Sequence, residues 1–158
     1  MRIATFNTPP NERYFEDYEV GATYECGEFS LSETEIIAFA QRFDPQAFHL
    51  DREAAAKSHF GGIIASGWHI GSAMMRVIVD NFLSPVASMG SPGVDEIRWL
   101  KPVRPDEVLK VRVTVEQARL SVSKPDRGLV HNLMEVVDRD AQVRMHVRSV
   151  GLIGCRPR

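Results

Sequence analysis

The chain is short of cysteine, of uninterrupted apolar stretches and of net charge, and each shortage excludes a class of protein. Its 158 residues contain two cysteines, Cys26 and Cys155, too few for a disulfide framework and without the spacing of a metal site. The longest apolar stretch, residues 67–83, contains a histidine, an arginine and an aspartate, and is therefore a poor membrane span. A net charge of -2 provides no broad basic surface for nucleic acid or for an anionic membrane. We therefore expect a protein of the reducing cytoplasm that binds neither.

The chain does contain enough apolar sequence for one folded domain. Its hydrophobic content of 44% and charged content of 25% are ordinary for a globular protein of this length. Residues 1–13 are polar and contain prolines, so we expect a flexible N-terminal arm ahead of a single domain over residues 14–158. The first residues lack the apolar core of a signal peptide, which agrees with a cytoplasmic location.

Helical periodicity dominates the first half of the chain. Ser32 followed by Glu35 has the spacing of a capping box and predicts the start of a helix. Apolar residues continue at helical spacing to Phe43, where the helix must end because Pro45 disfavours helical dihedrals in the residue before it. A second, longer helix is predicted from Ser66. Its sequence is apolar on nearly every side, which indicates burial.

The second half of the chain alternates with the period of β-strands. Strict alternation of apolar and polar residues predicts a half-buried antiparallel strand over residues 107–119. Further strands are predicted over residues 18–31, 91–100, 129–137 and 143–152. The predicted fold class is α+β: a curved antiparallel sheet of about five strands wrapped around one long central helix, which is the hot-dog arrangement. Such a sheet leaves edge strands unpaired, so we expect a homodimer or a higher homo-oligomer formed by edge-to-edge pairing.

A carboxylate and an imidazole, Asp44 and His49, lie five residues apart in a segment stiffened by a proline and two phenylalanines. Such a pair can hold one water molecule and move its protons. Each residue also has a plainer interpretation, because Asp44 before a proline could start a turn and His49 between apolar neighbours could be a core histidine. Asp51 is interpreted as the cap of a short helix. Asp44, His49 and Asp51 could also suggest a metal site, but no further ligand cluster appears, so the sequence predicts no metal site.

Gly67 stands at the start of the predicted buried helix, directly after Ser66, which we interpret as its N-cap. The first amides of a helix have free N–H groups and a partial positive charge, which stabilise negative charge on a carbonyl oxygen. An acid/base pair and such an amide together predict a site that adds water to, or removes it from, a carbonyl-activated double bond.

These motifs resemble the MaoC-like dehydratases, relatives of the (R)-specific enoyl-CoA hydratases. The resemblance covers residues 14 to 153 and is carried by Asp44-x-x-x-x-His49-x-Asp51, by residues 60–67 and by residues 98–106. It implies a hot-dog hydro-lyase of fatty acid metabolism that acts on an acyl-CoA thioester and needs no cofactor. It also implies that Asp44 and His49 hold the reacting water and that the Gly67 amide receives the thioester oxygen.

Two departures from the family pattern bear on the orientation of Asp44 and on substrate preference. The common Asp-x-Asn-Pro-x-His reads Asp-Pro-Gln-Ala-Phe-His here, and the usual His-Gly at the helix start is Ser66-Gly67. Gln46 and Ser66 are candidate substrate contacts. Three cations around a turn near the expected cavity mouth are candidates for the phosphates of coenzyme A or of a carrier protein, or else form a solvated turn; they are Arg98, Lys101 and Arg104.

Two rival functions remain open on sequence grounds. A thioesterase on the same fold would use the carboxylate to direct water at the carbonyl carbon, and a non-catalytic module would only bind the acyl thioester. The sequence also leaves open the length and branching of the acyl chain, the choice between coenzyme A and a carrier protein, and the physiological direction. Which of Asp44 and His49 protonates carbon is equally undecided.

Overall fold

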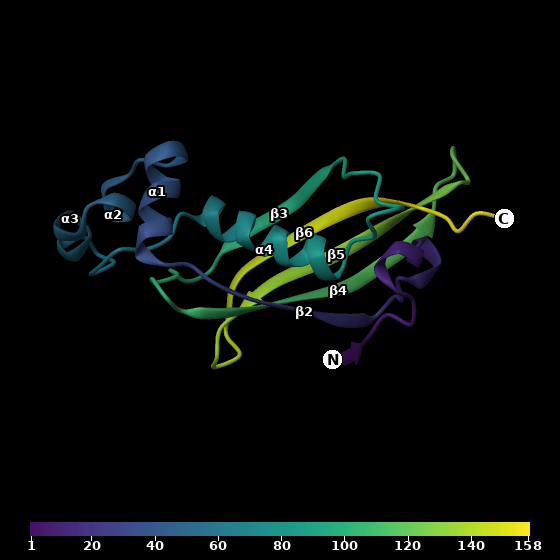
Figure 1. The fold of residues 1–158 in the computed structure, drawn as a ribbon, viewed down its shortest axis with the longest axis horizontal. Coiled ribbons are helices and arrows are strands. Elements are labelled where there is room, and N and C mark those ends of the chain that lie inside the picture. Colours follow the sequence, from purple (N-terminus) through teal and green to yellow (C-terminus); the bar gives the residue numbers. More distant parts are fainter.

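One long helix wrapped by a curved sheet forms the centre of the computed structural model, which describes all residues, Met1–Arg158 (Figure 1). The sheet has six strands in the order β1-β2-β4-β5-β6-β3, and all neighbours are antiparallel except β1 and β2. The strands are β1 (Arg2–Ala4), β2 (Ala22–Ser30), β3 (Gly93–Trp99), β4 (Val108–Leu120), β5 (Arg127–Val137) and β6 (Val143–Gly154). The predicted α+β hot-dog class is confirmed, with β1 as an additional short strand.

The central helix is α4 (Gly67–Asn81), and three shorter helices gather beyond its N-terminal end (Figure 1). These are α1 (Glu33–Phe43), α2 (Ala47–Leu50) and α3 (Arg52–Lys57). The predicted capping box is present at α1, since Ser32 Oγ accepts from the Glu35 amide at 3.1 Å and Glu35 Oε2 accepts from the Ser32 amide at 2.8 Å. No helix of the fold combines the length and the hydropathy that crossing a lipid bilayer requires.

The core lies between α4 and the inner face of the sheet. The alternation predicted for β4 is present, and its inner residues are almost completely buried: Leu109, Val111, Val113 and Val115. The helix contributes Ile70, Met74, Val77 and Ile78. Gly27 in β2 lets the helix approach closely, because its φ of +138° suits glycine and an added Cβ would lie 3.3 Å from Val77 Cγ1.

The first 13 residues pack against the fold, although the sequence predicts a flexible arm there. β1 pairs with β2, and the Phe6 ring stacks on Tyr24 with 4.2 Å between centroids. Arg13 is 5% exposed, and its guanidinium lies 3.6 Å from the Phe6 ring centroid. Arg13 Nη1 also donates to the carbonyl oxygens of Asn81 and Phe82 at 3.3 and 3.2 Å, which satisfies the C-terminal end of α4. The arm is therefore part of the domain, and two 3-10 turns, Pro10–Glu12 and Phe15–Asp17, lead from it into β2.

Candidate active site

The loop after α1 folds back on itself and brings Asp44 and His49 together. Two tight turns do this, with the Gln46 amide donating to the Asp44 carbonyl at 2.8 Å and the His49 amide donating to the Gln46 carbonyl at 2.9 Å. Asp44 Oδ2 then lies 3.2 Å from His49 Nε2. The predicted pair is therefore within hydrogen-bonding distance. Asp44 also takes part in a turn, but through its backbone carbonyl rather than its side chain, which is bonded to other side chains instead.

His49 is 4% exposed and has a fixed ring orientation. Its Nδ1 lies 2.6 Å from the Ile64 carbonyl oxygen. Because a carbonyl oxygen can only accept, Nδ1 carries a proton and Nε2 faces Asp44. A hydrogen bond between Nε2 and the carboxylate then requires one further proton between them, held by either partner. The pair is thus arranged to share and exchange a single proton, as acid/base chemistry requires.

Two donors and one imidazole surround the Asp44 carboxylate. Ser66 Oγ donates to Oδ2 at 2.7 Å, Gln46 Nε2 donates to Oδ1 at 2.7 Å, and His49 Nε2 lies 3.2 Å from Oδ2. Burial acts to raise the pKa of Asp44, but the hydrogen bonds from Gln46 and Ser66 and the neighbouring imidazole together outweigh it. The pKa of Asp44 therefore lies below its ordinary value, and the group is a carboxylate at neutral pH.

Ser66 occupies the N-cap position of α4, as predicted, but its hydroxyl does not cap the helix. The side chain is completely buried and its hydroxyl proton is used on Asp44 instead. Among the first amides of α4, that of His69 donates to the Ser66 carbonyl oxygen at 3.0 Å, whereas that of Gly67 has neither an intrahelical acceptor nor a side-chain cap. The free N–H group of Gly67 is available to an acceptor in the cavity.

Gly67 is also required by the packing of Trp99. A Cβ added at Gly67 would lie 2.3–2.7 Å from three atoms of the Trp99 indole, closer than any real contact. Trp99 meets Trp68 edge to face, with 5.1 Å between ring centroids. Both rings line the candidate cavity beside the Gly67 amide. An aromatic wall therefore stands next to the proposed donor.

The cavity itself has a volume of about 480 Å³, which is within the range of small-molecule sites. Asp44, His49 and Gly67 all belong to its lining. Its lining is completed by Gln46, Phe60, Ile64, Ala65, Trp68, Ile70, Trp99, Leu100, Lys101 and Pro102. Most of these side chains are apolar or aromatic, which suits an acyl group.

The structure separates the predicted site residues into two groups. The cavity is lined by Asp44, His49, Gly67, Gln46 and Lys101. Ser66, a candidate substrate contact, is completely buried outside this lining and donates a hydrogen bond to Asp44 instead. The other two predicted cations do not line it: Arg98 pairs with Glu96, and the Arg104 guanidinium donates to the carbonyl oxygens of Phe60 and Gly62. The aromatic residues Phe60, Trp68 and Trp99 were not singled out from the sequence. The positions of Phe60 and Trp99 inside the motif segments, and of Trp68 directly after one, were the only available indication.

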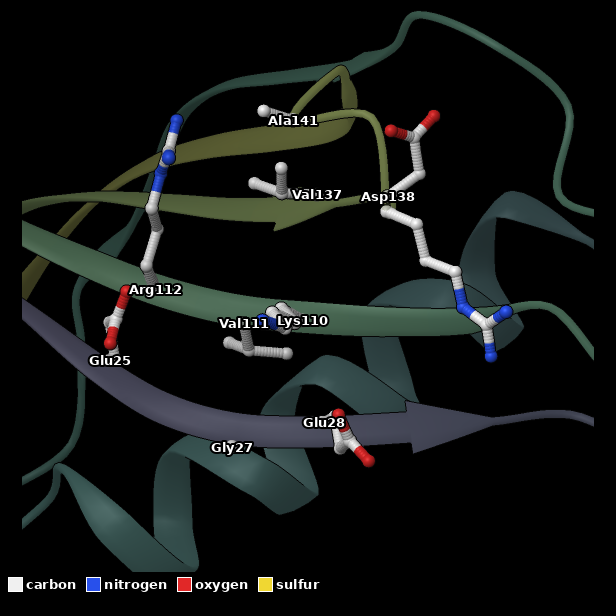
Figure 2. Close-up of a pocket in the computed structure, with 10 residues that line it drawn as sticks. Glu25, Gly27, Glu28, Lys110, Val111, Arg112, Val137, Asp138 and Ala141 are labelled. Atoms are coloured by element: carbon white, nitrogen blue, oxygen red, sulfur yellow. The ribbon is translucent and has the colours of Figure 1, made fainter.

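A larger hollow, of about 660 Å³, lies elsewhere, between β2, β4 and the β5–β6 hairpin (Figure 2). It is lined mainly by charged side chains, including Glu25, Glu28, Lys110 and Arg139. On β4, exposed Lys110 alternates with buried Leu109, which places the hollow on the face of the sheet away from the core. No carboxylate–imidazole pair and no helix N-terminus lines it. We therefore assign the candidate chemistry to the smaller cavity.

The hydrogen bond from Ser66 predicts a measurable effect on Asp44. Ser66→Ala should raise the pKa of Asp44 measurably, because a hydrogen bond that stabilises the charged form is lost. In the native protein the carboxylate stabilises the fold fully above pH 3.8, and that contribution is lost as the pH falls through the lowered pKa. NMR titration of the Asp44 carboxyl carbon measures the change. Ser72→Ala, which removes a hydroxyl bonded to the Trp68 carbonyl on the same helix, is the control. If the Asp44 carboxyl titrates at the same pH in both variants, the proposed effect of the Ser66 hydrogen bond is contradicted.

Comparison with known proteins identifies the family. The family model described as "MaoC like domain" matches residues 16–136, more than half of the chain. "Protein MaoC" of Klebsiella aerogenes is 30% identical over 109 residues, which are 68% of this chain but 32% of that protein. A protein of Methylorubrum extorquens named "3-hydroxybutyryl-CoA dehydratase" is 30% identical over 105 residues, 66% of this chain and 64% of its own length. The chain thus spans less than two thirds of either relative.

A solved structure gives the same result at the level of the fold. The crystal structure of a MaoC-like dehydratase from Rhodospirillum rubrum has 35% sequence identity and a TM-score of 0.85. The match covers 92% of this chain and 99% of that one. The chain therefore belongs to the MaoC-like family, and the resemblance expected from its motifs is confirmed.

Proposed function

We propose that this protein adds water to, or removes it from, the α,β double bond of an enoyl thioester, with coenzyme A as the thiol. The observation that carries the proposal is the 3.2 Å contact of Asp44 with His49 in a cavity that also contains the start of α4 at Gly67. Membership of the MaoC-like family supports the reaction class. The name of the Methylorubrum relative supports a coenzyme A thioester.

In the hydration direction, the oxygen of water forms a bond to the β-carbon and one of its protons passes to Asp44, which we assign as the main acid/base. The electron pair of the double bond moves toward the carbonyl, and negative charge develops on the thioester oxygen. The Gly67 N–H donates to that oxygen. The α-carbon then takes one proton from the Asp44–His49 pair, and the carbonyl re-forms. The reaction adds one water molecule and involves no net oxidation or reduction, so the proposal includes no cofactor.

Among the three predicted phosphate-binding cations, the cavity favours Lys101. Lys101 belongs to the cavity lining, and its ammonium group donates to Gln142 Oε1 at 2.5 Å, an exposed neutral partner that a phosphate can replace. Arg98 and Arg104 are bonded to other groups of the protein. We propose that Lys101 meets the charged part of the coenzyme A substrate at the cavity mouth.

A homodimer formed through β3 is part of the proposal. β3 is an edge strand of the sheet and has no neighbour beyond it. Apolar side chains are exposed on this strand and on α4, among them Val94, Met75 and Val79. Pairing of two β3 strands would cover such a surface. A light-scattering mass equal to the 17.8 kDa of one chain at micromolar concentration would contradict it.

Incubation with crotonyl-CoA distinguishes hydration from its two rivals. Hydration removes the absorbance of the enoyl thioester without releasing a thiol, which Ellman's reagent would detect. Release of thiol would favour a thioesterase, in which the same carboxylate directs water at the carbonyl carbon. Neither change, together with binding seen by calorimetry, would favour a non-catalytic module. We expect loss of absorbance with no thiol, and the reverse reaction from (R)-3-hydroxybutyryl-CoA.

A further inference from the structure

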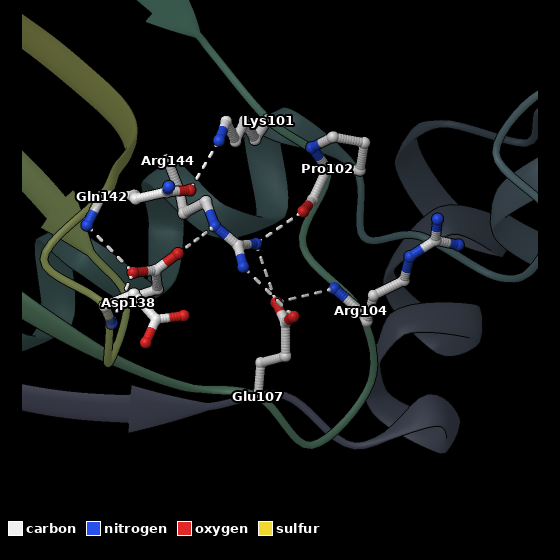
Figure 3. Close-up of polar contacts among 8 residues, drawn as sticks. Lys101, Pro102, Arg104, Glu107, Asp138, Gln142 and Arg144 are labelled. Atoms are coloured by element: carbon white, nitrogen blue, oxygen red, sulfur yellow. Dashed lines mark hydrogen bonds and ion pairs between the residues drawn. The ribbon is translucent and has the colours of Figure 1, made fainter.

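One polar cluster lies behind the cavity, centred on Arg144 of β6 and Glu107 before β4 (Figure 3). The Arg144 side chain is 14% exposed. Its Nη1 and Nη2 donate to the two oxygens of Glu107 at 2.9 and 3.3 Å, and its Nε donates to Asp138 Oδ2 at 2.8 Å. A guanidinium held by two carboxylates in this way has a single orientation.

Arg144 fixes one wall of the cavity with both its backbone and its side chain. Its carbonyl oxygen accepts from the amides of Leu100 and Lys101 at 2.8 and 3.3 Å. Its Nη1 donates to the Pro102 carbonyl oxygen at 2.7 Å. Leu100, Lys101 and Pro102 all line the cavity and belong to no regular strand. The conformation of this wall therefore depends on bonds to Arg144.

Glu107 connects the same cluster to a second wall of the cavity, at Phe60. Its Oε2, which already accepts from Arg144, also accepts from the Arg104 amide at 3.2 Å. The Arg104 guanidinium in turn donates to the carbonyl oxygens of Gly62, at 3.2 Å, and Phe60. Phe60 lines the cavity from a segment without regular structure. Both irregular walls are thus attached, through two arginines, to one carboxylate.

We infer that Arg144, Glu107 and Arg104 are positioning residues that set the distance between the two walls and thereby the fit of the acyl group. None of the three lines the cavity, so they act through Leu100–Pro102 and Phe60. The kinetic part of the inference depends on the proposed function, whereas the position of the walls can be measured without it.

Glu107→Gln tests the inference, because it keeps the shape of the side chain but removes the carboxylate that accepts from the Arg144 guanidinium and from the Arg104 amide. We expect the KM for crotonyl-CoA to rise about 10-fold while kcat changes less than about threefold, since Asp44, His49 and Gly67 stay in place. Both tryptophans of the chain, Trp68 and Trp99, line the cavity. Acrylamide should therefore quench the intrinsic fluorescence of the variant more strongly than that of the native protein.

The matched control is Glu135→Gln, which breaks the 2.9 Å pair with Arg112 elsewhere on the same sheet. It should change neither KM nor quenching. If Glu107→Gln behaves like this control, or lowers kcat with KM unchanged, the inference is wrong. If Glu107→Gln does not fold, Arg144→Lys is measured by the same criteria. This variant keeps the positive charge but loses the two parallel hydrogen bonds of the guanidinium to Glu107. Absence of any turnover by the native protein would reject the proposed function, and the quenching comparison would still decide the inference.

Discussion

Asp44→Asn is expected to lower the turnover of crotonyl-CoA by roughly 10²–10⁴-fold, the usual contribution of a positioned acid/base group. The amide has the shape of the carboxylate but cannot take a proton from water. The fold should tolerate the change at a cost of about 1 kcal/mol, because the Asn oxygen can still accept from Ser66. The Asn amide would face Gln46, which is exposed and can rotate to offer its own oxygen.

Asp51→Asn is the matched control for this prediction. Asp51 lies near Asp44 in sequence and caps α3, with its Oδ1 accepting from the amides of Glu53 and Ala54 at 3.0 and 3.1 Å. Asparagine is an equally good N-cap, so both stability and turnover should remain native. Steady-state rates and thermal midpoints of the two variants give the comparison. Turnover by Asp44→Asn within a few-fold of native would remove Asp44 from the mechanism.

Gly67→Pro is expected to lower kcat by roughly 10²–10³-fold, because it deletes the N–H group that is proposed to stabilise the thioester oxygen. The backbone can accept the substitution. Proline is favoured at the first position of a helix, and Ser66 before it already has φ -58° and ψ 138°, as a residue preceding proline prefers. The helix should therefore form as before, with a thermal midpoint close to that of the corresponding alanine variant.

Gly67→Ala separates the lost donor from the clash with Trp99. Both substitutions add a Cβ where the Trp99 indole now lies, 2.3–2.7 Å away, so both must displace that ring. Only proline removes the N–H group. The donor's contribution is therefore the ratio of the two kcat values, with tryptophan emission reporting whether Trp99 has moved equally in both. A ratio near one would mean that the thioester oxygen is bound elsewhere.

Local chemistry allowed most of the fold to be predicted from the sequence. The capping box at Ser32, the helix end before Pro45 and the alternation of β4 each depend on neighbouring residues, and all three are present. The ordered packing of residues 1–13 could not be predicted in this way, because it depends on contacts with residues far away in the sequence. Phe6 packs on Tyr24 and Arg13 satisfies the end of α4, contacts that no periodicity within residues 1–13 indicates.

The candidate site divides in the same way. The turn that pairs Asp44 with His49 is local, and so the two residues could be predicted to meet. The binding partners of each cation could not be predicted. Arg104, for example, donates to carbonyl groups more than forty positions earlier in the chain. The packing of Trp99 on Gly67 likewise joins two segments whose proximity only the complete sheet and helix determine.

The three residues of β1 have a consequence for the size that an assembly can reach. By lying along β2 they cover one margin of the sheet with a strand too short to recruit another chain. In the proposed dimer, only the opposite margin, β3, pairs between molecules. A subunit with one unpaired strand edge stops assembling at the dimer. Removal of the first five residues would expose the edge of β2 as well, and two unpaired edges would permit open-ended filaments.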